Sequence, residues 1–251
     1  VKENAAASLV DIGDGVVCLE FHTKMNAVDP EMIAMIDESC DIVAKDFVGM
    51  VVGNHATNFS AGANIFQVLL ACQKADWDML EQMVAGLQNA NMKMKFLSKP
   101  VVTAPAGMAL GGGCEMAMHG ARCQPCGETY MGLVEVGVGV IPAGGGCKES
   151  MVRATEGIPT GAVEAGLNLQ HFYAKVFENI ATAKVGTSAV EVMDLGYIRK
   201  TENISMGRDQ HIWEAKQVVL GLSKFYKPPK PALIPVMGDN FIGMTNGILF
   251  N

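Results

Sequence analysis

The segment that most constrains the fold is residues 99–146, where two apolar runs each end in a glycine cluster. Glycines 111–113 follow a β-type run and precede a short helix rich in alanine and methionine. Because glycine has no Cβ, a backbone there can approach a ligand closely, and the helix that follows presents free N–H groups to a phosphate or an oxyanion. Tight packing of the helix on the strand would explain the same glycine cluster equally well. The dinucleotide pattern G-x-G-x-x-G is excluded, because Met116 takes its last position.

Two glutamates lie in otherwise uncharged parts of this segment. Glu115 falls in the first turn of the short helix, and Glu135 falls in a run, 129–136, that predicts a strand or extended segment. A buried carboxylate is costly unless it has a partner or a chemical task. Each glutamate could cap or pair with another group. Together, beside backbone N–H groups, they could activate a water or move a proton next to a carbonyl.

The rest of the chain alternates apolar runs with helical patterns. Strands are predicted at 15–21, 49–53 and 101–104. Helix starts are predicted at Asp29-Pro30, at Asp76 and at the capping box that begins with Ser188, and a further amphipathic helix is predicted at 209–224. Residues 227–236 contain four prolines and are predicted to be irregular. Strands separated by helices predict an α/β architecture.

Composition excludes several classes of protein. The net charge of −7, without a basic block, argues against a nucleic-acid partner. No apolar run reaches the roughly 18–20 residues that span a bilayer, and the N-terminal residues lack the order of a signal peptide, so no membrane partner is expected. Seven cysteines are an odd number and favour a reducing, cytoplasmic location.

Several smaller motifs have plain structural explanations. Cys123 and Cys126 form a lone C-x-x-C that lacks further zinc ligands, so they are interpreted as reduced structural cysteines. The five histidines form no metal-spaced pair, so no metal is expected. Residues 58–65 (NFSAGANI) form a small-residue loop that could supply a second backbone N–H or be an ordinary connection. Ser60 lies in no G-x-S-x-G elbow and is not predicted to be a nucleophile.

Four motifs together resemble the crotonase, or enoyl-CoA hydratase/isomerase, superfamily. FSAGANI resembles the A-G-A-D-I loop of that family, and KPVVTAPAGMALGGGCE resembles its K-P-V-I-A-A-V-N-G-x-A-L-G-G-G-C-E stretch. ETYMGLVEVGVGVIPAGGG and KMNAV resemble two further family segments. Their order and separation fit over residues 9–225. The segment from Gly207 to the prolines resembles the crotonase-like C-terminal region of fused 3-hydroxyacyl-CoA dehydrogenases.

The resemblance implies a fold and a set of site residues. The fold would be a crotonase-like spiral of ββα units with a helical C-terminal region, assembled as trimers or hexamers. Catalytic domain boundaries of 1–225 are expected, followed by a proline-rich extension, 226–251, that starts a truncated C-terminal segment. The N–H groups of Ala63 and Gly112 would form an oxyanion hole. The residues that the resemblance assigns to substrate and CoA binding are Lys24, Ala61, Ala63, Asn64 and Ile65.

The implied reaction is hydration of a 2-enoyl-CoA in fatty-acid β-oxidation, with Glu115 and Glu135 as the two catalytic glutamates. Coenzyme A would be part of the substrate, and no separate cofactor is expected. A Δ3,Δ2-enoyl-CoA isomerase that uses Glu135 alone is the nearest alternative. A non-catalytic acyl-CoA-binding or scaffolding domain of a fused dehydrogenase is another. Two departures from the family pattern stand out: Asn64 replaces an aspartate, and Cys147-Lys148-Glu149 replaces T-Q-R, which removes a basic residue.

Overall fold

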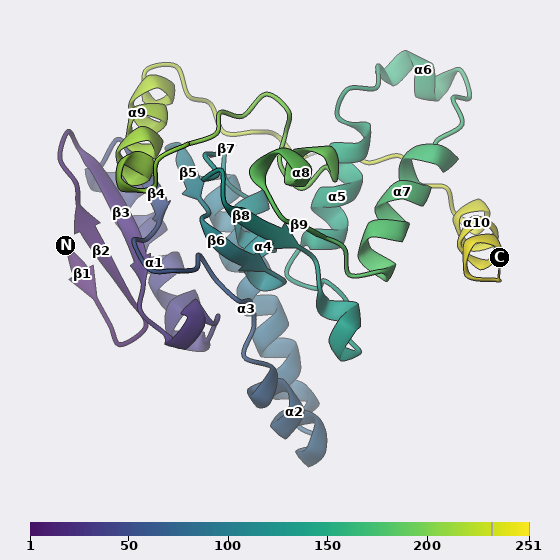
Figure 1. Ribbon diagram of the computed structural model, residues 1–251, viewed down its shortest axis with the longest axis horizontal. Helices are drawn as coiled ribbons and strands as arrows, with labels where there is room; N and C mark the ends of the chain where they lie inside the picture. The colour runs from purple at the N-terminus through teal and green to yellow at the C-terminus, as the bar shows by residue number, and fades with distance from the viewer. Residues whose placement is uncertain (232, 251) are drawn as a thin grey trace.

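The computed structural model describes residues 1–231 and 233–250 (Figure 1). In this part of the chain the larger sheet has six strands in the order β1-β2-β3-β4-β5-β7. The pairs β1–β2 and β2–β3 are antiparallel, and β3, β4, β5 and β7 are parallel neighbours. The bounds are β1 Lys2–Glu3, β2 Ala7–Asp11, β3 Val16–Phe21, β4 Gly49–Gly53, β5 Val101–Ala104 and β7 Arg122–Cys123.

A smaller sheet lies beside the first and contains β6, β8 and β9 in that order. Strand β6 pairs in parallel with β8, and β9 pairs antiparallel with β8. The bounds are β6 Gly107–Leu110, β8 Thr129–Gly132 and β9 Val185–Gly186. Strand β5 is followed closely by β6, so the chain leaves the first sheet and enters the second just before the first glycine cluster.

The helices are placed by their apolar faces. Their bounds are α1 Pro30–Asp46, α2 Ile65–Lys74, α3 Trp77–Lys95, α4 Gly112–Met118, α5 Gly146–Thr155, α6 Thr160–Glu164, α7 Gln170–Ala181, α8 Ala189–Asp194, α9 His211–Ser223 and α10 Asp239–Phe250. Short 3-10 turns occupy Lys24–Asn26, Glu135–Val138 and Arg208–Gln210. Helices α2 and α3 form a hairpin that projects from the body of the molecule (Figure 1).

The larger sheet is buried on both faces, which explains its continuous apolar runs. Side chains of β3 alternate between two clusters, as the two-residue period of a strand requires. Leu19 packs in the cluster that includes Met32 and Ile36 of α1. Cys18 packs in the cluster that includes Ala215 and Val219 of α9, the helix that lies beside β3 and β4 (Figure 1).

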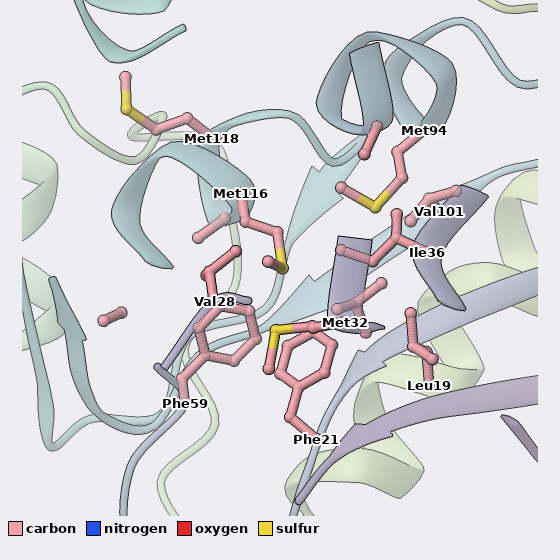
Figure 2. Close-up of a cluster of buried hydrophobic side chains, with 14 of the residues drawn as sticks. Leu19, Phe21, Val28, Met32, Ile36, Phe59, Met94, Val101, Met116 and Met118 are labelled. Atoms are coloured by element: carbon pink, nitrogen blue, oxygen red, sulfur yellow. The ribbon is translucent and has the colours of Figure 1, made fainter. Parts of the chain in front are cut away.

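The largest core cluster lies between α1, α3, α4 and the two sheets. Figure 2 shows Met116 of α4 close to Val28 and Phe59, with Met94 and Ile36 on the far side of the cluster. Phe21 and Phe59 meet edge to face, with ring centroids 6.0 Å apart. Met116 packs in this core and directly follows Glu115 on α4. The packing of α4 therefore also fixes the position of the Glu115 carboxylate.

Most predicted elements are confirmed. The Asp29 side chain accepts a hydrogen bond from the Met32 N–H at 2.8 Å, and Pro30 is the first residue of α1. Asp76 caps α3, and Ser188 caps α8. The α/β architecture and the three strands expected before the first glycine cluster are also observed.

The prediction of an extended run over 129–136 is wrong in its second half. Strand β8 ends at Gly132, and Glu135 is the first residue of a 3-10 turn. Strand β8 pairs with β9 up to Gly132, opposite Val185, and the turn that follows is closed by the Val140 N–H, which donates to the Glu135 carbonyl at 3.2 Å. The turn ends at Gly139, whose φ of +82° suits glycine.

The proline-rich segment 227–236 has no helix or strand among its described residues, and residue 232 lies outside them. Helix α10 then returns to the body and packs on α7 (Figure 1), with Phe241 and Met244 against Tyr173. The Tyr173 hydroxyl donates a hydrogen bond to the Pro235 carbonyl at 2.5 Å. No helix in the described part of the chain is long and apolar enough to cross a bilayer.

Candidate active site

Two loops meet at the first glycine cluster. The loop after β4 runs beside β6, with Leu110 N–H donating to the Ser60 carbonyl at 2.9 Å and Ser60 N–H donating to the Met108 carbonyl at 3.0 Å. A Cβ on Gly62 would lie 2.7 Å from the Leu110 carbonyl oxygen, and its φ is +90°. Only glycine therefore allows the two loops to approach so closely. The small residues of the 58–65 loop do not by themselves indicate this contact.

The approach brings two backbone N–H groups close together. A Cβ on Gly112 would lie 3.5 Å from the Ala63 nitrogen, and one on Gly62 would lie 3.1 Å from the Gly112 nitrogen. Within the described residues, neither N–H donates to a backbone acceptor. Gly112 is the first residue of α4, where helix N–H groups have no intrahelical partner. Two adjacent free donors are the arrangement that stabilises a developing oxyanion.

Glu115 lies one turn into α4 and is 2% exposed. Its Oε1 accepts a hydrogen bond from the Gly146 N–H at 2.8 Å. Burial, reinforced by the nearby Glu135 charge, raises the pKa of Glu115 to about 7. A carboxylate with this pKa exchanges protons readily near neutral pH.

Glu135 is half-buried at the start of its 3-10 turn. Within the described part of the chain, both of its carboxylate oxygens are buried without a hydrogen-bond partner. Burial raises its pKa above the ordinary value. A Cβ on Gly111 would lie 3.4 Å from Oε1 of Glu135, so this carboxylate faces the first glycine cluster. The structure therefore brings both predicted glutamates to the two N–H groups.

The second glycine cluster encloses Glu115. A Cβ on Gly146 would lie 3.0 Å from Oε1 of Glu115, and one on Gly144 would collide with Oε2. Helix α3 holds this cluster in place: the Asn91 side chain donates to the Gly144 carbonyl at 2.9 Å, and Gln88 donates to the Ala143 carbonyl at 2.6 Å. The small residues of the second glycine cluster thus make room for the Glu115 carboxylate.

A charged cluster next to this site was missed by the sequence analysis. Glu149, on α5, is 0% exposed, and its Oε1 lies 2.5 Å from Lys95 Nζ and 2.8 Å from Lys148 Nζ. These cations, with His119 nearby, hold the pKa of Glu149 down at about 2 despite burial. From the sequence alone, Cys147-Lys148-Glu149 in place of T-Q-R indicates only the loss of a basic residue. The buried acid it introduced had no signal in the local sequence, because Lys95 is 54 residues away.

His119 is neutral and structural. Its Nδ1 lies 2.6 Å from the Glu115 carbonyl oxygen, which can only accept, so Nδ1 carries the proton. Its Nε2 is then free to accept from Lys148 Nζ at 3.1 Å. Burial lowers the pKa of His119 to about 4, in agreement with this tautomer.

The remaining residues that the resemblance assigns to substrate and CoA binding lie on the 58–65 loop, at the start of α2 and in the 3-10 turn at Lys24. Asn64 caps α2, with Oδ1 accepting from the Gln67 N–H at 3.4 Å, which explains how it takes the place of an aspartate. Ala61 N–H donates to the Met25 carbonyl at 3.0 Å, next to the exposed Lys24. Ile65 is 44% exposed on α2.

The cysteines are free thiols in the described residues, and burial raises the pKa of Cys123 to about 12. No group of three or more His, Cys, Asp and Glu side chains in the described part of the chain is arranged to hold a metal ion.

Known proteins resemble this chain in sequence. The profile of the Enoyl-CoA hydratase/isomerase family matches residues 15–167. A Bacillus subtilis protein named "Probable 3-hydroxyacyl-CoA dehydrogenase" is 38% identical over 240 residues, which are 95% of this chain and 29% of that protein. The fatty acid oxidation complex subunit alpha of Shewanella oneidensis is 34% identical over 53% of this chain and 20% of its own length. The chain thus spans less than a third of either relative.

Solved structures share the fold. An enoyl-CoA hydratase from Polaromonas sp. JS666 superposes with a TM-score of 0.71 at 20% identity, covering 87% of this chain and 77% of the other. An enoyl-CoA hydratase from Bacillus anthracis superposes with a TM-score of 0.68 at 16% identity, covering 87% and 76%. The crotonase-like fold that the motifs implied is therefore confirmed.

Proposed function

The chain belongs to the enoyl-CoA hydratase/isomerase family, and we propose that its own reaction is the addition of water across the double bond of a 2-enoyl-CoA thioester. One observation carries the proposal. Two carboxylates without any cationic partner in the described residues, Glu115 and Glu135, lie beside the adjacent N–H groups of Ala63 and Gly112. Burying such charges is costly, and hydration chemistry supplies a use for both.

The two N–H groups would bind the thioester carbonyl oxygen. When the oxygen of water bonds to C3, the electron pair of the C2–C3 double bond moves toward the carbonyl, and the thioester oxygen becomes enolate-like. Donors that are already in place stabilise that charge where it forms, and losing one donor of this type typically costs about 10²–10³ in rate.

The two carboxylates would move the protons. Glu115 accepts a hydrogen bond from the Gly146 N–H, which holds its carboxylate in place, and its pKa of about 7 makes it basic enough to take a proton from the water. Burial raises the pKa of Glu135 above its ordinary value, so it can hold a proton more readily than a free glutamate and is suited to give one to C2. The product is a 3-hydroxyacyl-CoA, and both carboxyl groups then exchange protons to restart the cycle.

Recognition of coenzyme A would involve the residues at the rim of the site. Lys24 is exposed, and a lysine there can meet a phosphate as a point charge. Ala61 and Asn64 flank the proposed oxyanion donor Ala63, and Ile65 offers an exposed apolar side chain. The names of the relatives support a place in fatty-acid oxidation, beside a dehydrogenase in the same longer protein.

The direct test is to incubate the purified chain with crotonyl-CoA and with a longer 2-enoyl-CoA, and to follow loss of the conjugated thioester absorbance. We expect 3-hydroxyacyl-CoA, identified by mass spectrometry. Binding of crotonyl-CoA without any product would contradict hydration and favour a non-catalytic acyl-CoA-binding domain.

An isomerase is the second candidate, because the unpartnered Glu135 alone could move a proton between C2 and C4 of a 3-enoyl-CoA. Conversion of 3-enoyl-CoA without hydration of 2-enoyl-CoA by the unmodified chain would favour that reaction.

A further inference from the structure

A second cavity lies away from the two glutamates, between α5, α7, the segment 193–201 and the end of α9. Its volume is about 1520 Å³, which exceeds the roughly 300–1,000 Å³ of ordinary ligand pockets. Neither Glu115 nor Glu135 lines it, and neither do Ala63 or Gly112. It is therefore separate from the site described above.

The cavity is positively charged in an acidic protein. Among the described residues, seven lysines and arginines line it, against three glutamates and aspartates. Five of these cations pair with carboxylates, and Arg153 and Lys227 are the two that form no ion pair among the described residues. The whole chain carries a net charge of −7, so this concentration of cations is local. A concave surface lined by one sign of charge attracts ligands of the opposite sign.

Arg153 lines the cavity and has buried donor groups without a partner among the described residues. Its Nη2 donates to the Met118 carbonyl at 2.7 Å, but Nε and Nη1 are buried without a partner in the described part of the chain. No carboxylate of the described residues forms an ion pair with it. A guanidinium stays charged in proteins, and the acidic charge that acts on Arg153, that of Glu149, is already paired with Lys95 and Lys148, so Arg153 is left without a counter-charge of its own. Arg199, which also lines the cavity, is near enough for its charge to lower the pKa of Arg153 further.

Other unpaired donors lie in the same lining. The Ser150 and Tyr226 hydroxyl groups are buried without a partner among the described residues. Arg199 already pairs with Glu156 at 2.7 Å, and Lys227 forms no ion pair within the described part of the chain. The same lining holds two buried acceptors without a partner among the described residues, Glu149 Oε2 and Asn179 Oδ1. The four unpaired donor atoms outnumber them, as expected of a site for an anion with several oxygens.

Aromatic rings stand next to these cations. Phe172 is 40% exposed and Phe225 is 87% exposed, and both line the cavity. Exposed aromatic faces stack well on planar bases. A ligand that carries both phosphate groups and a planar base is a nucleotide.

We propose that this cavity is a second ligand site that binds a nucleotide, with its phosphates at Arg153 and Arg199 and its base against Phe172 or Phe225. A phosphate would supply the counter-charge and the acceptors that the Arg153 donors lack. This site stands independently of the hydratase proposal, because it shares no lining residue with the oxyanion donors or the two active-site glutamates.

Isothermal titration of the chain with ADP tests the proposal, with ribose 5-phosphate and adenosine as ligands that lack the base or the phosphates. We expect ADP to bind most tightly. Arg153→Gln should weaken ADP and ribose 5-phosphate by about 10-fold or more, since a charged hydrogen bond contributes about 1.5–3 kcal/mol. Phe225→Ala should weaken ADP severalfold and leave ribose 5-phosphate unchanged.

Two controls keep the test sharp. Lys45→Ala removes an exposed charge of α1, far along the chain from the cavity, and should leave ADP binding unchanged. Because coenzyme A also contains an adenosine and phosphates, ADP could enter the active site instead. Competition by crotonyl-CoA, or loss of ADP binding in Lys24→Ala, would therefore overturn the proposal.

Absence of ADP binding would overturn it equally. Should Arg153→Gln fail to fold, Arg199→Gln and Lys227→Ala test the same contact, because Lys227 is exposed and unpaired in the described residues. Unchanged affinity in both of these variants would contradict the proposal.

Discussion

Two carboxylates beside the first turn of α5 show how differently one residue type can be used. Glu115 accepts a hydrogen bond from Gly146, the first residue of α5, and has no cation as a partner in the described residues. Glu149, on the same helix, lies within 2.8 Å of two lysine Nζ atoms. Both are almost completely buried, yet the pKa of Glu115 rises to about 7 while that of Glu149 falls to about 2.

The difference lies in the partners and not in the depth of burial. Desolvation raises the pKa of both groups, and cations reverse its effect only at Glu149. A carboxylate that stays ionised at any ordinary pH is suited to hold a structure together. One that titrates near neutrality is suited to proton transfer. Glu135, which like Glu115 has no cation as a partner in the described residues, belongs with Glu115 in this comparison.

The largest effect is expected from Glu135→Gln, which removes the proposed proton donor. Hydration of crotonyl-CoA should fall by about 10²–10⁴, the usual contribution of a general acid or base. Glu164→Gln is the matched control, since Glu164 is exposed on α6 and should leave turnover unchanged. Near-normal turnover in a folded Glu135→Gln variant would remove Glu135 from the mechanism.

Glu149→Gln should instead lower stability. It leaves two lysine charges beside a buried amide, and breaking a buried ion pair costs about 3 kcal/mol or more. Because the pKa of Glu149 is lowered from 4.5 to about 2, its stabilisation is present above pH 4.5 and is lost as pH falls toward 2. Urea unfolding measures the difference. The control Glu178→Gln, in an exposed pair with Lys175, should cost less than about 1 kcal/mol.

Glu115→Gln should act on stability in the opposite direction. The raised pKa means that the folded state destabilises the ionised form, so the cost is present above pH 7 and absent below pH 4.5. An amide oxygen can still accept from the Gly146 N–H. The variant should therefore gain up to about 3 kcal/mol at pH 8 and none at pH 4. A loss of stability at pH 8 would show that the Glu115 charge is compensated after all.

The smallest effect is expected from Lys24→Ala. Lys24 is exposed, and exposed charge pairs contribute about 1 kcal/mol or less. KM for crotonyl-CoA should rise a few-fold and kcat should stay unchanged in steady-state kinetics. A fall in kcat alone would place Lys24 in the chemical step rather than in binding.

The sequence allowed much of the fold to be predicted, together with the segments that meet at the candidate site, because these depend on local signals. Asp29-Pro30 determines a helix start, and the glycine clusters mark the close approach of loops. The turn at Glu135 was missed because it is held by backbone hydrogen bonds, such as that from the Val140 N–H to the Glu135 carbonyl, while the apolar residues around it are those of a strand. The Glu149 cluster was missed because Lys95 of α3 and His119, which follows α4, come from distant segments of the chain.

The most direct measurement of the central claim is the activity of Glu115→Gln on two substrates, 2-enoyl-CoA and 3-enoyl-CoA. In the proposed mechanism, hydration needs Glu115 as the base that activates water, whereas movement of the double bond would need Glu135 alone. We predict that Glu115→Gln loses about 10²–10⁴ of its hydration rate and keeps any isomerisation of 3-enoyl-CoA within a few-fold of the unmodified chain. Hydration that survives in Glu115→Gln would contradict the account.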